Sequence, residues 1–135
     1  PLLLRLEQAS TDGSAHYDYL AISVEHVCPQ TIAPGSQWSQ WFLNADDHAA
    51  WVHSLANLVL LNSRKNSAAQ NYDFDKKKTK YFASGDTCAF TLTNEVRSYS
   101  QWTLKELKAR RVELFERLAK AWRLEQSLEK WWSEE

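Results

Sequence analysis

Four residues in two separate runs have side chains that together suit the hydrolysis of a phosphodiester. Glu25 and His26 are adjacent in the run 22–30, and Asn57 and Asn66 belong to a later run. A histidine with its ordinary pKa of about 6.5 keeps a neutral ring nitrogen at cellular pH, so His26 is a candidate general base. Carboxylate and amide oxygens are hard ligands, so Glu25 and Asn66 are candidates to hold Mg²⁺ or Mn²⁺.

Asn57 and four further residues are expected to support this chemistry. Asn57 is expected to orient the loop that carries His26 through hydrogen bonds, without touching the metal itself. Positive or hydrogen-bonding side chains near the metal would hold a phosphate backbone. The candidates for that contact are Arg64, Lys65, His53 and Lys77.

Each candidate also has a purely structural interpretation. A lone histidine after a strand is more often a hydrogen-bonded structural residue than a catalyst, and His53 fits the edge of an amphipathic helix. Asn57 could end a helix, and Asn66 could be an exposed residue in a first helical turn. Lys77 belongs to a lysine run made of Lys76, Lys77, Lys78 and Lys80, and a solvated helix face explains this run equally well. For His26, its combination with the other three residues favours the catalytic interpretation.

The same residues carry a resemblance to a known family. His26-Val27-Cys28-Pro29, with Asn57 and Asn66, resembles the HNH, or ββα-metal, endonuclease superfamily. A wider pattern carries a closer resemblance, and it consists of the run 25–30, the run from Trp51 to Leu58, Phe74 with Lys77, and Trp102-Thr103. The closer resemblance is to the C-terminal nuclease domain of GmrSD-type modification-dependent restriction enzymes, and it covers most of the chain.

The resemblance implies a role for each site residue. It makes His26 the general base, Glu25 and Asn66 the metal ligands, and Asn57 the residue that positions the base. The wider superfamily usually has Asp or His where Glu25 stands and often His where Asn66 stands. The resemblance also implies a ParB-like nucleotide-hydrolysing domain preceding this one, and activity in cutting or nicking foreign DNA, as in phage-defence nicking enzymes of the SspE type.

Composition fits one soluble domain. The chain has 135 residues, of which 44% are hydrophobic, and this is enough to bury a core. A formal net charge of −1 argues against a chain that coats nucleic acid by bulk charge, although the stretch 64–80 is locally positive. Cys28 and Cys88 form no Cys-x-x-Cys pair, so structural zinc is not expected; two free thiols are favoured over a disulfide between them.

Apolar runs and the first residues of the chain bear on where the protein is located and on its boundaries. No apolar run is long enough to span a membrane, and the start lacks the pattern of a secretory signal, so we expect a cytoplasmic protein. Pro1, in a chain without methionine, indicates the C-terminal part of a longer protein. Residues 1–135 are expected to form a single nuclease domain, with a homodimer as an open alternative.

Hydrophobic spacing and capping residues predict the elements that position the site. We expect an α+β fold in which a ββα-metal finger is flanked by helices. Helices are predicted at 2–9, 46–55, from 64 onward, 74–81 and from 103 toward 132; strands are predicted at 17–24 and 58–61. Thr103 and Glu106 form the signature of a capping box. The stretch 87–99 is ambiguous.

Two functions from other classes remain open at this point. One is a catalytically inactive module, derived from a nuclease, that binds DNA or another protein. The other is a helical interaction domain in which His26 is structural, and this function predicts neither metal binding nor affinity for nucleic acid. Cleavage that depends on a divalent metal separates both from an endonuclease, and RNA as the substrate is also left open.

Overall fold

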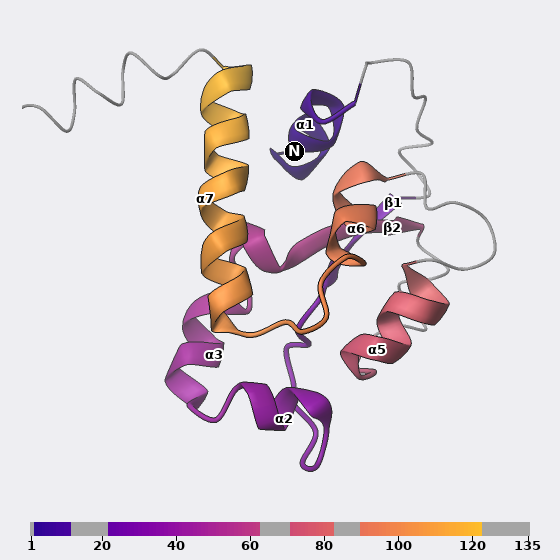
Figure 1. The fold of residues 1–135 in the computed structure, drawn as a ribbon, viewed down its shortest axis with the longest axis vertical. Coiled ribbons are helices and arrows are strands. Elements are labelled where there is room, and N and C mark those ends of the chain that lie inside the picture. Colours follow the sequence, from indigo (N-terminus) through magenta and orange to yellow (C-terminus); the bar gives the residue numbers. More distant parts are fainter. Residues whose placement is uncertain (1, 12–21, 63–70, 83–89, 123–135) are drawn as a thin grey trace, which may run out of the picture.

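A computed structural model describes residues 2–11, 22–62, 71–82 and 90–122 of the chain. The described part combines short helices, one two-stranded sheet and one long helix (Figure 1). In chain order the elements are α1 (Leu2–Ala9), β1 (Ile22–His26), α2 (Gln37–Trp41), α3 (Ala45–Trp51), the 3-10 helix η1 (Leu55–Asn57), β2 (Leu58–Asn62), α5 (Phe74–Lys76), the π-helical turn η2 (Lys77–Tyr81), α6 (Thr91–Val96) and α7 (Leu104–Ala121). The predicted α+β class is confirmed.

The sheet places Glu25 and His26 on opposite sides of one strand. β1 pairs with β2 in antiparallel register, with Glu25 opposite Val59 and His26 opposite Leu58. Successive side chains of a strand point to opposite faces. Val24 is accordingly 49% exposed, whereas Glu25 is only 5% exposed. The carboxylate therefore points toward the interior, and His26 shares the more open face with Val24.

β2 separates the two hydrophobic clusters of the core. Val59 and Leu61 belong to a cluster built around Trp38, Phe74 and Trp102, whereas Leu60 belongs to a cluster that includes residues of α1, α6 and α7. Alternation along the strand thus sends neighbouring side chains into different clusters. Its continuous apolar run is that of a strand buried on both faces.

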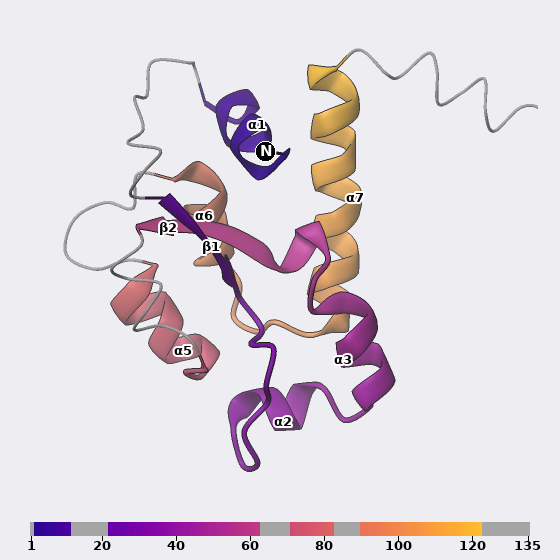
Figure 2. The same ribbon diagram turned by 180° about the vertical axis from the view of Figure 1, so that it is seen from behind.

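The long helix α7 runs beside α1, η1 and α3, along one side of the molecule (Figures 1 and 2). It begins with the predicted capping box, in which Thr103 accepts from the amide of Lys105 and Glu106 reaches back to the amide of Thr103. Its buried residues recur at the three- and four-residue spacing of one helical face, and they are Leu107, Arg110, Leu114, Leu118 and Ala119. The part of this helix predicted beyond residue 122 lies outside the described residues.

The other predicted elements differ from the structure mainly at their ends. β1 reaches His26, and the predicted strand residues 17–21 lie outside the described part. The helix predicted at 46–55 ends at Trp51, where a turn leads into η1. The helix predicted at 74–81 becomes α5 followed by the π-helical turn. The ambiguous stretch 87–99 contains α6.

One described helix was not predicted, and one predicted helix lies outside the described residues. The helix α2 was not predicted, although Ser36, whose side chain accepts from the amide of Ser39, is a recognisable N-cap. The helix predicted from Arg64, which would complete a ββα finger, falls in the undescribed residues 63–70. None of the described helices combines the length and the apolar character needed to cross a bilayer.

Candidate active site

A cavity of about 330 Å³ lies beside the end of β1. Glu25 and His26, the last two residues of β1, both border it. The remaining lining is largely polar, and it consists of Val24, Pro29, Gln30, Thr31 and Asn71. Gln30 and Asn71 were not predicted as site residues, and no spacing in the sequence relates Asn71 to β1.

His26 is paired with a second histidine. Its Nε2 lies 3.1 Å from Nδ1 of His53, and the two rings meet edge to face with centroids 5.1 Å apart. His53 lies in the turn after α3. Burial lowers the pKa of His26, and electrostatic repulsion between a protonated His26 and its neighbours His53 and Lys77 lowers it further. The imidazole of His26 is therefore neutral at neutral pH, as a general base must be.

Asn57 connects the strand end to two other segments. Its Oδ1 accepts hydrogen bonds from the amide of Cys28, at 2.8 Å, and from Nε1 of Trp102, at 3.0 Å. Its Nδ2 donates to the carbonyls of Cys28 and Val52, at 2.9 and 2.8 Å. The amide is fully buried. These are hydrogen bonds of the kind on which its predicted orienting role depends.

Lys77 occupies a different environment from the one predicted. Its side chain is fully buried, and its Nζ donates to Glu25 Oε1 at 2.7 Å and to the carbonyls of His26 and Val27 at 2.8 and 3.0 Å. A lysine ammonium has three protons to donate, and all three have acceptors. This location does not fit the predicted contact with DNA, because the charge faces the protein interior. In the sequence, Lys77 is distinguished only by its place, with Phe74, in the family resemblance.

The carboxylate of Glu25 is hydrogen-bonded to Lys77 through one of its two oxygens. Burial raises its pKa, opposed by the charge and hydrogen bond of Lys77, and burial lowers the pKa of Lys77 in turn. Lys77 takes Oε1, and the described residues provide no hydrogen bond to Oε2. A hard carboxylate oxygen at the edge of a polar cavity fits Mg²⁺ or Mn²⁺ in its chemistry. In the described part of the chain, no three His, Cys, Asp or Glu side chains cluster to hold a metal ion.

A comparison with protein families finds one that matches most of the chain. The model of the C-terminal domain of GmrSD restriction endonucleases matches residues 2–117. The chain belongs to this family. It is therefore a domain of a restriction endonuclease, a class of enzyme whose substrate is DNA. A comparison with curated proteins gave no match.

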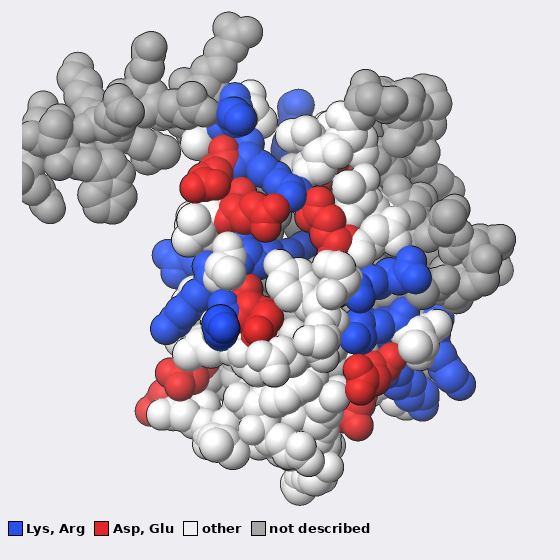
Figure 3. Space-filling view, viewed as in Figure 1, with Lys and Arg blue, Asp and Glu red and all other residues white. Residues whose placement is uncertain are grey.

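Three predicted residues of this GmrSD-family domain cannot be placed. Asn66, Arg64 and Lys65 lie outside the described residues. The described lysines of the basic stretch 64–80 belong to α5 and η2, where basic and acidic side chains gather side by side (Figure 3). Lys78 is tied to the carbonyl of Tyr99 and to Asp75. Acidic residues such as Asp75 therefore offset part of the positive charge on this surface.

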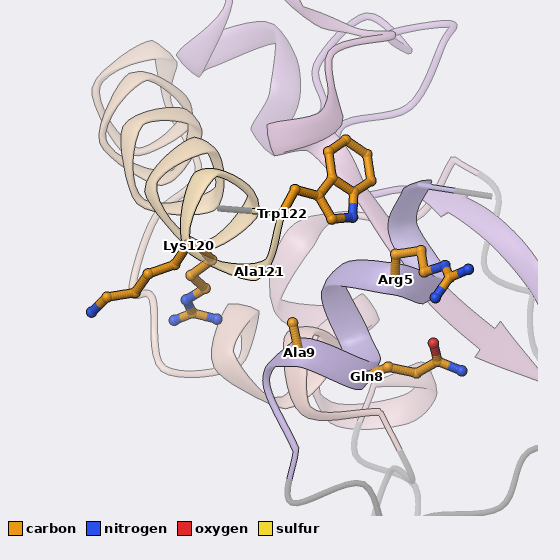
Figure 4. Close-up of a pocket in the computed structure, with 7 residues that line it drawn as sticks. Arg5, Gln8, Ala9, Lys120, Ala121 and Trp122 are labelled. Atoms are coloured by element: carbon orange, nitrogen blue, oxygen red, sulfur yellow. The ribbon is translucent and has the colours of Figure 1, made fainter. Parts of the chain in front are cut away.

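A larger cavity of the GmrSD-family domain contains none of the predicted site residues. It has a volume of about 600 Å³ and lies between α1 and the end of α7 (Figure 4). Arg117, on its wall, pairs with both Glu95 and Glu113, so its charge is already balanced. The other lining residues are Arg5, Gln8, Ala9, Lys120, Ala121 and Trp122. The candidate chemistry is thus concentrated at His26.

Proposed function

We propose that the domain is a metal-dependent DNA endonuclease in which His26 is the general base. The observation that carries the proposal is the position of His26, a neutral histidine beside a carboxylate at a polar cavity, in a chain of the GmrSD family. A cytoplasmic protein of restriction or antiviral defence is the setting that this family suggests. The DNA would be nicked or cut.

Each proposed site residue would have a distinct role in the reaction. His26 accepts a proton from a water molecule, which attacks phosphorus in line with the departing 3′ oxygen. Asn57 holds the strand end so that the imidazole keeps its orientation. Glu25 and Asn66 would hold Mg²⁺ or Mn²⁺, whose charge stabilises the phosphate and the departing oxygen. The products are a 5′-phosphate and a 3′-hydroxyl.

The nucleic-acid contacts belong to the same proposal. Arg64 and Lys65 would contact the phosphate backbone, since they directly precede the proposed metal ligand Asn66 in the sequence. A ParB-like domain in the longer protein would choose the DNA, and pairing of two such domains would convert nicks into double-strand cuts. In this proposal, the proton transfer at His26 requires neither the ParB-like domain nor a second copy of this domain.

The test is cleavage of supercoiled plasmid by the chain and by His26→Ala, with Mg²⁺, with Mn²⁺ and with excess chelator. We expect open-circular product from the parent, no product with chelator, and a rate on the order of 10²- to 10⁴-fold lower for the variant. Gln40→Ala, an exposed residue of α2, is the matched control and should cleave as the parent does. Equal cleavage by His26→Ala would exclude His26 as the base.

One observation favours a second function. Lys77 already neutralises Glu25, as expected if the fold persists in a DNA-binding or protein-binding module that no longer holds metal. In that case the folded parent binds DNA, or a protein, and gives no product with either metal. Isothermal titration of the chain with Mn²⁺ distinguishes the two functions, because only the nuclease should bind the ion.

A further inference from the structure

We propose that His53 is a positioning residue that selects the tautomer of His26. In this arrangement His26 carries its proton on Nε2 and donates it to Nδ1 of His53, so Nδ1 of His26 is the atom that accepts a proton from water. The inference rests on the proposed function, because it names the basic atom of that same site. It gives His53 a role other than contact with a phosphate.

The geometry restricts which nitrogen of His26 is available. Nε2 is engaged with His53 at 3.1 Å. Nδ1 of His26 has no hydrogen bond to any described residue. A water molecule can therefore lose a proton to Nδ1 without breaking the pair, whereas Nε2 could accept one only after the histidines separate.

Two arrangements of the protons are compatible with the distance between the rings. If His26 donates, both rings are protonated on Nε2, which is the intrinsically favoured tautomer of neutral histidine. If His53 donates, both rings are protonated on Nδ1, and His26 has no lone pair outside the pair. The first arrangement is thus both more stable for the isolated rings and the only one that leaves a base.

Asn57 fixes the two histidines relative to each other. Its side chain bonds to both the amide and the carbonyl of Cys28, two residues after His26. It also donates to the carbonyl of Val52, the residue before His53. One buried amide therefore ties together the two backbone segments that carry the rings. Without this connection, the entropy cost of ordering two partly exposed side chains would offset much of the stabilisation from their hydrogen bond.

Three substitutions separate tautomer selection from contact with DNA. His53→Ala removes the acceptor, whereas His53→Asn retains an oxygen close to the position of Nδ1. We expect His53→Ala to lower kcat for plasmid nicking by about 10- to 100-fold with little change in KM. His53→Asn should recover most of that loss, and Glu116→Gln on the exposed face of α7 should change neither constant. A change confined to KM, or no change in kcat, would overturn the proposal.

Ring nitrogen NMR spectra of the whole chain test the tautomer without any cleavage assay. We expect His26 to be protonated on Nε2 in the parent and in His53→Asn, and to lose this preference in His53→Ala. Protonation of His26 on Nδ1 in the parent, or an unchanged spectrum in His53→Ala, would overturn the proposal. If the parent cuts no DNA, the proposed nuclease function fails, while the spectra still decide the tautomer.

Discussion

The ammonium of Lys77 is an unusual group to find in the interior of so small a domain. It is stabilised there because each of its protons has an acceptor at 2.7–3.0 Å, two of them carbonyls at the end of β1 and one the carboxylate of Glu25. Removing either charge would leave the other one buried without a partner, which costs far more than an exposed ion pair contributes. Lys77 therefore holds the strand end that carries His26.

Lys77→Met should lower the free energy of unfolding by about 3–5 kcal/mol, because the substitution strands the carboxylate of Glu25 in the interior. Urea unfolding measures the change. Lys80→Met, at an exposed position in the same lysine run, is the matched control and should stay within about 0.5 kcal/mol of the parent. A Lys77→Met protein as stable as the parent would show that the ion pair is not formed in solution.

Cys28 gives a second prediction at the residue scale. Burial raises the pKa of its thiol to about 12, and the cysteine is free. In a Cys88→Ser background, thiol reagents at pH 8 should label Cys28 slowly in the folded chain and rapidly in urea. Because the folded pKa is raised, this thiol contributes stability that is complete below about pH 9 and is lost as the pH rises toward 12. Rapid labelling without urea would contradict the buried location.

At the scale of elements, the sequence predicted what local rules decide. The capping box at Thr103 and the apolar spacing behind it predicted α7, and the apolar run predicted β2. The same rules missed α2, which is short, and the π-helical turn, whose residue Lys77 faces inward because of acceptors far away in the chain. The pairing of His26 with His53 could not be predicted either, since no periodicity relates residues that meet only when the segments fold together.

The contact between His26 and His53 depends on Asn57. Asn57→Ala leaves the amide of Cys28 and the indole of Trp102 without their buried acceptor, at about 1–3 kcal/mol for each unpaired group. We therefore expect a loss on the order of 3 kcal/mol or more in the free energy of unfolding, measured in urea. Asn57→Asp keeps the acceptor but places a carboxylate oxygen against two carbonyls, and should also destabilise. Stability equal to that of Gln40→Ala, the exposed control, would contradict this network.

At the scale of the molecule, one arginine joins the long helix to the site. Arg110 of α7 is 2% exposed, and its Nη1 donates to the carbonyls of Ala56 and Leu58, at 2.6 and 3.3 Å. These carbonyls flank Asn57 on both sides. Burial lowers the pKa of Arg110 to about 10, so the guanidinium is still charged at neutral pH. The helix α7 thereby holds the backbone on both sides of Asn57, and Asn57 in turn orients the segment that carries His26.

This connection predicts a coupling between α7 and the strand end. Arg110→Lys keeps the charge but loses the planar fork, whose Nη1 reaches the carbonyls of Ala56 and Leu58 and whose Nη2 reaches that of Leu92. It should therefore destabilise almost as much as Arg110→Met, by about 2–4 kcal/mol. Arg111→Met is the matched control, since Arg111 stacks on Trp51 and Phe115 at the surface and should cost about 1 kcal/mol or less.

The amide of Val27 reports whether the coupling reaches the site, because it donates to the carbonyl of Asn57 at 2.8 Å. Its hydrogen exchange under native conditions should accelerate in Arg110→Lys by more than global unfolding accounts for, while Arg111→Met leaves it unchanged. Plasmid nicking should slow in parallel, because a looser Asn57 no longer sets the distance between the histidines. Exchange at Val27 that follows global stability alone would mean that α7 supports the fold without orienting the site.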